Sequence, residues 1–462
     1  MVKRTRSKAA NAEPSPPTYF LSLTLENYRS FGPKQTLDLS DGNGRPAPWT
    51  VILGDNGTGK TSLLRKLVDM VPKLDQWLTE QKAKHLVHVD WWSAPAEDEP
   101  PDIHIGSQGT RSRASYGYGA RLEDAGSTFQ TASLEVQRAG RPGSFEASVE
   151  HTSAPIDKMV LFAYGANRPI GSGSLSEYHA DGTRSLTVEN SPLMPAEEWL
   201  LQQYLLVRHG NGDAQVAKQR LETVKGLLKE LLPEDDIQDI TFKAIDLSSA
   251  RQRIAVHVKT PYGEVQLRAL SLGYRTLMAW MIDLAVQMFA RYPDSKQPLH
   301  EPAVVLVDEI DLHLHPKWQR QLFANLSHQF PQVQFVVTAH SPLIVQAAGA
   351  DANIVVVRRP EGQDHVVIDK APSAVHSWRV DQILTSDLYG LPSARSPELD
   401  EKYARRRVLL RKPKLTKKEQ AELDELEAWL VTQPGGETPE EMSVWRTLRE
   451  VAVQLKAKSG RS

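Results

Sequence analysis

Hydrophobic positions near the start of the chain fall into short runs of the kind that form strands. The three runs are Tyr19–Leu25, Gln35–Leu39 and Trp49–Leu53. The last run is apolar throughout, which is typical of a strand buried on both faces. Helical periodicity then extends from Thr61 to Trp77 and beyond. We therefore predict that 19–86 forms the first lobe of an α/β domain.

The pattern degrades between 87 and 150. Residues 93–101 are rich in proline and acids, and 107–126 are rich in glycine, serine and arginine. Such compositions are typical of loops. Ser133–Arg138 alone has the character of a strand, and it is isolated. The prediction for 87–150 is an irregular insertion of short strands and loops.

Clear periodicity returns over 151–250, where we predict a strand followed by a helical insertion. Met159–Tyr164 is apolar enough for a buried strand, and Ala196–Val207 and Ala214–Leu232 have helical spacing. The second helix is amphipathic, and its predicted apolar stripe comprises Val216, Leu221, Val224, Leu227, Leu228 and Leu231.

Strands and helices alternate over 251–372, which indicates a sheet covered on both faces. The predicted elements are a hairpin at Arg253–Lys259 and Glu264–Leu267, a helix from Leu270 to about Tyr292, strands at Pro302–Asp308, Val333–Thr338 and Asn353–Val357, and a helix at Lys317–Ser327. After Trp378 the sequence is helical and polar without strand patterns, so 373–462 is predicted to be a helical extension.

Composition narrows the class of protein. The 462 residues are 40% hydrophobic and 24% charged with a net charge of −2, which argues against coating nucleic acid through bulk charge. There is no cysteine, so disulfides and thiolate chemistry are excluded. Residues 1–18 are basic and then rich in Pro, Ala and Ser, which predicts a disordered arm rather than a signal peptide. No run of about 18 apolar residues occurs, so we expect no membrane span and a cytoplasmic location.

Candidate chemistry begins directly after the third apolar run. The sequence there is Gly54-Asp55-Asn56-Gly57-Thr58-Gly59-Lys60-Thr61-Ser62, which fits the P-loop pattern G-x-x-x-x-G-K-[ST]. Glycines let the backbone approach an anion, and N–H groups of the turn and the following helix point at phosphates. Lys60 can reach the β- and γ-phosphates, and the Thr61 hydroxyl is placed to ligate Mg²⁺. The alternative is a glycine-rich turn that matches by chance.

Two later strand ends carry polar side chains. The run Val304–Val307 leads into Asp308 and Glu309. Asp308 can hold Mg²⁺ directly or through water, and Glu309 can orient and deprotonate an attacking water. His340 follows Val333–Thr338 and is placed to contact the γ-phosphate. By itself, the acid pair or the histidine would be interpreted as an ordinary polar residue at a strand end. The upstream P-loop favours a role for both in nucleotide chemistry.

Two other positions have open alternatives. Ser271 and Gly273 begin the long predicted helix, where N–H groups and the helix dipole form an anion site, although an ordinary N-cap is the commoner use of serine. Arg168 follows the strand Met159–Tyr164 and can approach a nucleotide, or form a loop salt bridge.

The order of these motifs resembles the ATP-binding-cassette (ABC) ATPases of the RecF, SMC and OLD type. Leu23–Phe31 at the start and Asp311–Pro316 after the acid pair also look like this family. The resemblance implies an ABC-ATPase head, with a mixed sheet flanked by helices, in which two heads enclose two ATP molecules. Within the family, 308–320, 378–384 and Leu391-Pro392 look like the Septu anti-phage ATPases of the PtuA group and the retron-associated ATPases.

The resemblance also implies a role for each candidate residue. Lys60 and Thr61 would hold phosphate and Mg²⁺, Asp308 would assist the metal, Glu309 would be the general base and His340 the switch. Ser271 and Gly273 would reach the γ-phosphate of a second copy, and 311–315 would lie across the dimer interface. The family's Q-loop glutamine has no secure counterpart, with Gln130 and the Asn167-Arg168 pair as candidates.

The sequence lacks recognisable nuclease motifs, which bears on the partners that we expect. No toprim-like acid pair follows Ala347 and no His-Asn-His pattern is present, so a nuclease would be a separate HNH-type subunit. The basic run Lys402–Lys418 either contacts DNA or is the solvated face of a helix. Three functions stay open: an anti-phage ATPase, dimeric or larger, that regulates such a nuclease on DNA; a RecF-like DNA repair ATPase; or a scaffold stabilised by nucleotide with little turnover.

Overall fold

The computed structural model describes residues 17–71, 109–139, 145–150, 159–245 and 253–430, with short gaps at 125, 127, 172–173, 176–177, 179–180, 211, 233–236, 373 and 413–414. The chain divides into two compact units, Met1–Tyr389 and Gly390–Ser462, which are described separately. The predicted arm before residue 17, the first helix beyond residue 71 and the extension after residue 430 lie outside the described residues.

A six-stranded sheet forms the centre of the first unit. Its order is β14 (Val367–Lys370), β13 (Asn353–Arg358), β3 (Trp49–Leu53), β12 (Val333–Thr338), β11 (Ala303–Val307) and β7 (Leu161–Tyr164). All neighbours are parallel except β14, which is antiparallel to β13 and was not predicted. Because the carboxyl ends of parallel strands meet at one edge, the segments after β3, β11, β12 and β7 all emerge together.

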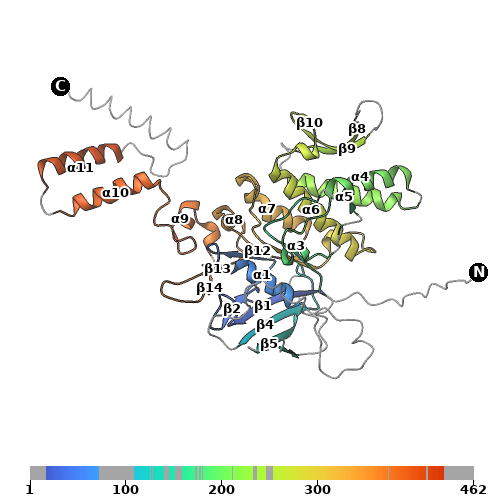
Figure 1. The fold of residues 1–462 in the computed structure, drawn as a ribbon, viewed down its shortest axis with the longest axis horizontal. Helices are drawn as coiled ribbons and strands as arrows, with labels where there is room; N and C mark the ends of the chain where they lie inside the picture. The colour runs from blue at the N-terminus through green and yellow to red at the C-terminus, as the bar shows by residue number, and fades with distance from the viewer. Residues whose placement is uncertain are drawn as a thin grey trace, which may run out of the picture. The chain divides into compact units, whose positions relative to one another are not determined.

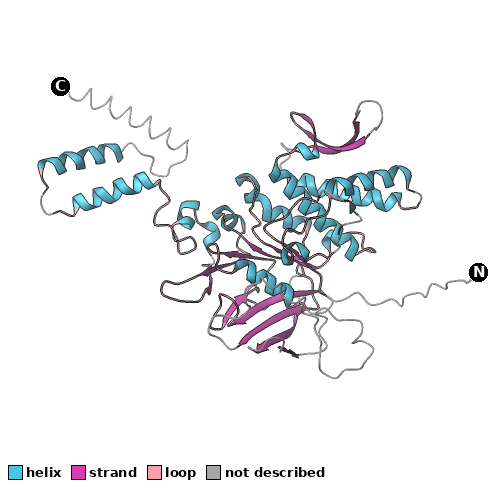
Figure 2. Ribbon diagram, viewed as in Figure 1, coloured by secondary structure: helices cyan, strands magenta, loops and turns pink. Residues whose placement is uncertain are grey.

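Helices and a second sheet cover the two faces of this sheet. Val304 and Leu306 of β11 pack in one cluster with the helix after the P-loop, whereas Val305 and Val307 face the other helices. The continuous apolar pattern of the strand therefore reflects burial on both faces. The first helix lies between the two sheets in Figure 1, and Figure 2 shows the separation of helices and strands. The helices of the first unit are α1 (Lys60–Asp69), α3 (Arg184–Thr187), α4 (Ala196–His209), α5 (Ala214–Leu231), α6 (Leu272–Arg291), α7 (Pro316–Gln329), α8 (Pro342–Ala347) and α9 (Val380–Leu384).

The segment predicted as an irregular insertion instead supplies most of an antiparallel sheet. Its order is β2 (Gln35–Asp38), β1 (Thr18–Glu26), β4 (Gly109–Tyr118), β5 (Gln130–Ala139) and β6 (Phe145–Glu150). The region is therefore less irregular than predicted, because β4 is a long strand and the strand predicted within β5 is not isolated. In β4 the small Ser112 and Ala114 alternate with Arg111 and Arg113, and the arginines lie close to Glu135 of β5. Only Tyr116 on the buried face of β4 is large, so the sequence shows little of the alternation of apolar and polar residues expected for a strand.

A third sheet joins β10 (Gly263–Gln266), β9 (Arg253–Thr260) and β8 (Asp239–Ile245). The hairpin of β9 and β10 agrees with the prediction, but β8 was not foreseen. The stacked rings of Tyr204 and Phe242 connect β8 to α4. One residue of the predicted apolar stripe on α5 is wrong: Val216 is 48% exposed, and the next residue, Ala217, takes its place on the buried face of the first turn.

The second unit contains α10 (Pro397–Leu410) and α11 (Lys417–Leu430). Three residues of the basic run form ion pairs across these helices: Arg405 with Glu422, Arg406 with Glu427, and Lys412 with Glu419. Buried Leu409 and Leu423 contribute apolar contact. Part of the basic run therefore stabilises the two-helix unit. Within the described part of the chain, no helix has both the length and the apolar character needed to cross a bilayer.

Candidate nucleotide site

The P-loop connects β3 to α1 in a curled backbone conformation. Gly54 and Gly59 have φ values of 146° and 94°, and a Cβ added at Gly54 would lie 2.2 Å from the carbonyl oxygen of Val357. Only glycine fits both the dihedral and the space. Lys60 lies over the loop, where its Nζ donates to the carbonyl oxygens of Gly54 at 2.7 Å and Asp55 at 2.9 Å. Burial lowers the pKa of Lys60, opposed by nearby carboxylates.

The open side of the loop presents polar groups. Asp55, Asn56 and Gly57 are exposed, and the Thr58 hydroxyl donates to the carbonyl oxygen of Asp55 at 2.8 Å. Helix α1 begins directly at Lys60, so its first N–H groups have no partner within the helix. This arrangement suits a phosphate group. Ser62 faces the loop before β2, where Arg29 donates to its hydroxyl at 3.4 Å.

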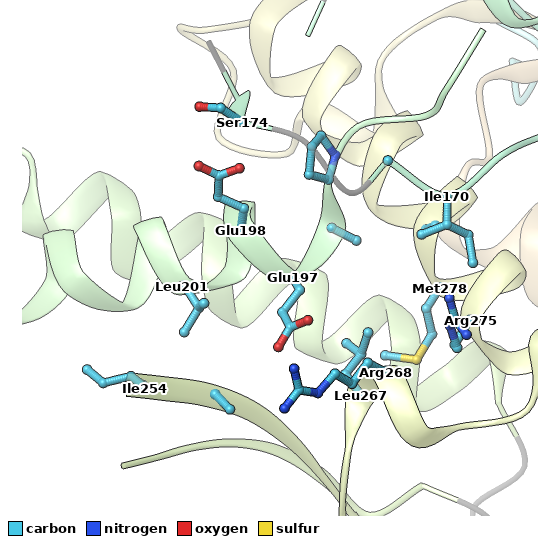
Figure 3. Close-up of a pocket in the computed structure, with 15 residues that line it drawn as sticks. Ile170, Ser174, Glu197, Glu198, Leu201, Ile254, Leu267, Arg268, Arg275 and Met278 are labelled. Carbon is cyan, nitrogen blue, oxygen red and sulfur yellow. The ribbon is translucent and has the colours of Figure 1, made fainter. Parts of the chain in front are cut away.

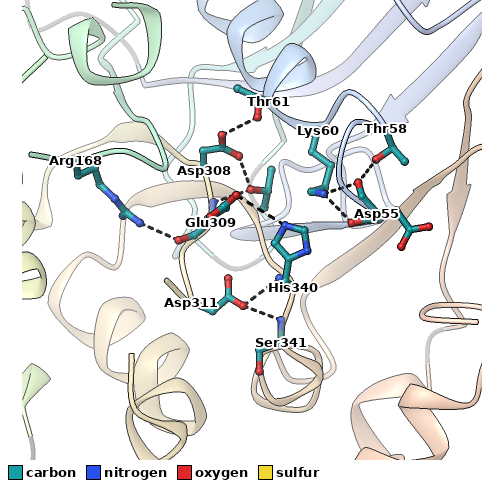
Figure 4. A network of polar contacts seen from close by, with 12 residues as sticks. Asp55, Thr58, Lys60, Thr61, Arg168, Asp308, Glu309, Asp311, His340 and Ser341 are labelled. Carbon is teal, nitrogen blue, oxygen red and sulfur yellow. Dashed lines mark hydrogen bonds and ion pairs between the residues drawn. The ribbon is translucent and has the colours of Figure 1, made fainter. Parts of the chain in front are cut away.

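Asp308 lies beside the P-loop at the end of β11. One carboxylate oxygen accepts a hydrogen bond from the Thr61 hydroxyl at 2.7 Å, and the other accepts from the Thr338 hydroxyl at 2.6 Å (Figure 4). A hydroxyl and a carboxylate are oxygen ligands that Mg²⁺ prefers, often completed by substrate phosphates and water. No cluster of three His, Asp or Glu side chains that could hold a metal occurs among the described residues. The residues present thus fit an ion shared with a nucleotide.

Glu309 and His340 lie next to each other on the same edge. Glu309 has a left-handed φ of 50°, its side chain is 34% exposed, and its Oε1 lies 3.9 Å from Nε2 of His340 (Figure 4). The Glu309 N–H donates to the Thr338 hydroxyl at 2.7 Å. Thr338 thereby contacts both members of the acid pair. Its position at the end of the apolar strand β12 was the sequence signal that could have identified it.

Asp311 binds the histidine loop of its own chain. Its Oδ2 accepts from the N–H groups of His340 at 3.0 Å and Ser341 at 2.7 Å. The family resemblance implied only a position across a dimer interface. Within the chain, the side chain stabilises the loop that carries His340.

Arg168 approaches the acid pair rather than the P-loop. Its Nη2 donates to the carbonyl oxygen of Glu309 at 2.8 Å (Figure 4). Among the described residues, the hydrogen bond of Arg168 is to this main-chain oxygen and not to a carboxylate. The other Q-loop candidate, Gln130, is exposed at the beginning of β5, opposite Tyr118.

Ser271 and Gly273 are separate from the P-loop of the same chain. Ser271 occupies the N-cap of α6, but its side chain makes no capping hydrogen bond. Gly273 packs closely on the loop after β11, because an added Cβ would lie 2.5 Å from the carbonyl oxygen of His313. Both line a hollow of about 550 Å³ to which no P-loop residue contributes.

A further hollow of about 600 Å³ flanks α6 on another side. Arg275 and Met278 of α6 line it, together with Leu201 of α4 (Figure 3). Glu197 and Arg268 point into the same space (Figure 3). The hollow includes none of the predicted nucleotide-site residues.

Fold and site together define an α/β P-loop domain with an acid pair at a neighbouring strand end. A family described as "AAA domain, putative AbiEii toxin, Type IV TA system" matches residues 49–346, well over half of the chain. The chain belongs to this family of AAA domains. A second AAA-domain family matches residues 22–68.

The curated relatives of this chain include Septu proteins and retron ATPases. The Septu protein PtuA of Bacillus mycoides is 25% identical over 417 residues, covering 88% of this chain and 49% of the relative. The PtuA of Bacillus thuringiensis is 27% identical, covering 44% of this chain and 49% of the relative. The "Retron Vc95 probable ATPase" of Vibrio cholerae is 43% identical, covering 18% of this chain and 16% of the relative. The matched chain thus spans about half the length of the Septu relatives.

Solved structures that match the chain are distant from it in both sequence and structure. An Smc head bound to a domain of ScpA has a TM-score of 0.42 and 16% identity, covering 76% of this chain and 97% of that one. The recombination mediator protein RecF has a TM-score of 0.40 and 12% identity, covering 78% and 98%.

Proposed function

We propose that this protein binds ATP with Mg²⁺ and hydrolyses it to ADP and phosphate. Lys60 neutralises the β- and γ-phosphates, and the loop N–H groups bind their oxygens. Bound Mg²⁺ would be held by Thr61 and Asp308 and would offset the charge that develops on the phosphates. Glu309 accepts a proton from the attacking water, and His340 contacts the γ-phosphate.

One observation carries this proposal: Asp308 accepts the Thr61 hydroxyl at 2.7 Å while Glu309 remains partly exposed beside His340. The two halves of the site come from residues 247 positions apart in the chain. A chance P-loop match would not be expected to align with an acid pair in this way.

We further propose that two copies assemble to complete the site. Ser271 and Gly273 line a hollow without P-loop residues, which suits contact with the nucleotide of a second copy. The exposed side chain of Leu272 between them supports an apolar contact there. ATP binding would close this dimer and hydrolysis would open it.

The biological role that we propose is anti-phage defence, in which the ATPase regulates a separate HNH-type nuclease on DNA. The similarity to Septu proteins and retron ATPases supports this role. The match spans about half of the Septu proteins, so the role of the whole relative extends to this chain as part of the proposal.

Phosphate release tests the chemistry. Glu309→Gln should retain nucleotide binding and lose about a hundred-fold or more of the turnover, because it removes the general base. Glu361→Gln, at an exposed loop position, is the matched control and should hydrolyse ATP normally. Normal turnover in Glu309→Gln would reject the assigned base. Binding without turnover in the unmodified protein would instead support the scaffold.

The assembly and the role have separate tests. Light scattering of Glu309→Gln should show an ATP-dependent increase in mass that Ser271→Arg abolishes. Phage plaque counts in cells that carry the protein together with the proposed HNH-type nuclease should fall, and Lys60→Ala should remove the protection. Equal plaque counts in all strains would exclude the defence role.

A further inference from the structure

Arg168 is a buried guanidinium without an acidic hydrogen-bond partner. The residue is 7% exposed, and its Nε has no hydrogen-bond partner in the described part of the chain. Burial lowers the pKa of Arg168 to about 10, opposed by the charges of Asp308, Glu309 and Asp311. A buried charge is unfavourable unless specific contacts compensate for it. The contacts of this side chain therefore indicate its role.

The first contact is to the backbone of the predicted general base. Arg168 donates to the carbonyl oxygen of Glu309, and Thr338 accepts the N–H of the same residue. Side chains from two other strand ends thus bind both polar main-chain groups of Glu309. The φ of 50° at Glu309 is uncommon for a residue with a side chain, so it needs such support. This conformation sets the direction of the Glu309 carboxylate.

The second contact is to α6. The Arg168 guanidinium lies 5.7 Å from the ring centroid of Trp280, a distance suited to a cation–π interaction. Tyr164 meets the same indole edge-on, with centroids 5.8 Å apart. The carbonyl oxygen of Tyr164 also accepts the N–H of Asp308 at 2.8 Å. The end of β7 therefore binds both residues of the acid pair and packs on Trp280.

We propose that Arg168 is the positioning residue for Glu309, and that Trp280 makes this positioning depend on the placement of α6. Helix α6 starts at the Ser271 N-cap, the segment proposed to contact a second copy. Contact at that end of the helix would reach Glu309 through Trp280 and Arg168. This inference rests on the proposed ATP hydrolysis, and it assigns Arg168 to the base rather than to the phosphates.

The first test separates nucleotide binding from turnover. Arg168→Lys keeps the positive charge but removes the planar donor group that reaches Glu309. We expect turnover at saturating ATP to fall about 10- to 100-fold, with ATP affinity changed less than about three-fold, because small misplacement of a reacting group has large kinetic effects. Arg220→Lys is the matched control, since Arg220 also lies 5.7 Å from an aromatic ring of α6, that of Phe289. It should hydrolyse ATP normally.

Two outcomes would overturn the assignment. Unchanged turnover in Arg168→Lys would remove the positioning role, and a parallel loss of ATP affinity and turnover would place Arg168 on the nucleotide. Trp280→Phe keeps a smaller ring and should give a decrease in turnover of the same kind but smaller size. A Trp280→Phe protein with normal turnover would contradict the link to α6.

Hydrogen exchange tests the backbone directly and does not require hydrolysis. Arg168→Lys should accelerate exchange in a peptide covering 308–314, while a peptide covering β12 at 333–337 should stay as in the unmodified protein. Equal exchange at 308–314 would reject the inference. Absence of phosphate release from the unmodified protein would reject the proposed function alone, and the exchange result would still decide whether Arg168 holds the turn.

Discussion

Two buried aspartates, Asp283 and Asp308, both contact Tyr164, but they differ in the hydrogen-bond donors that surround their carboxylates. Asp283 is 3% exposed and Asp308 is 4% exposed. Asp283 accepts hydrogen bonds from the hydroxyls of Tyr164 and Tyr178 and from the N–H of Met194, all within the protein core. Among the described residues, the Asp308 carboxylate accepts hydrogen bonds from two threonine hydroxyls, and one of them belongs to the P-loop.

The comparison teaches that burial alone does not distinguish a structural carboxylate from a candidate site. The partners of Asp283 connect α6, the end of β7 and the segments at 178 and 194, so the carboxylate joins parts of the core. Under the proposed function, the Thr61 hydroxyl would turn from Asp308 to the metal ion. We therefore propose Asp308, which lies beside the partly exposed Glu309, as the functional carboxylate.

The largest expected effect is the loss of stability when the carboxylate of Asp283 is removed. Asp283→Ala should lower the free energy of unfolding by about 3 to 5 kcal/mol, because three buried donors lose their acceptor. Urea denaturation measures the change. Asp308→Ala should cost clearly less, and an equal loss from both would break the distinction between the two aspartates.

The second expected effect is a weaker apparent affinity for Mg²⁺ when Asp308 is changed. Asp308→Asn should weaken the apparent Mg²⁺ affinity in the ATPase assay by about 10- to 100-fold, as is usual when a group that supports a metal is removed. Titration of Mg²⁺ at fixed ATP measures this change. Asp283→Asn should leave the Mg²⁺ requirement as it is, and a matching shift there would contradict the comparison.

The third prediction concerns the hydroxyl that connects Asp308 to Glu309. Thr338→Val should lower the free energy of unfolding by about 1 to 2 kcal/mol, since the N–H of Glu309 then loses its acceptor. Turnover should also fall, because one of the two main-chain contacts of Glu309 is gone. Thr338→Ser keeps the hydroxyl and should restore both properties. Failure of serine to do so would assign the effect to the methyl group.

The smallest expected effect is a pH dependence of stability. Burial raises the pKa of Asp283, against the lowering effect of its hydrogen bonds. The folded protein then binds this proton more readily than the unfolded chain, so the stability contribution decreases as pH rises from about 4 through the folded pKa, by at most about 1.4 kcal/mol per pH unit. The difference between the unmodified protein and Asp283→Asn measures it. A difference that grows in the opposite direction would contradict a raised pKa.

Several features of this protein follow from the sequence by itself. The strand Trp49–Leu53, the P-loop turn and the helix after it are continuous in the chain, and each obeys local rules of periodicity and backbone conformation. The apolar runs that end at Asp308 and before His340 likewise predicted strands β11 and β12. Parallel strands bring their carboxyl ends together, so the adjacency of these groups was predictable once the sheet was inferred.

Only the tertiary structure decided which distant groups meet. The pairing of β4 with β1 joins residues about 90 positions apart, and the buried face of β4 combines the small Ser112 and Ala114 with Tyr116, which gives no continuous apolar alternation. The sequence placed Arg168 directly after a predicted strand but did not indicate its hydrogen-bond partner. That partner is the main-chain carbonyl oxygen of Glu309, and every residue has such a group. Asp283 in the middle of α6 looked like any helical polar residue until Tyr164, Tyr178 and Met194 surrounded it. Periodicity reports which face of an element is buried, whereas hydrogen bonds between elements depend on packing geometry that no local pattern encodes.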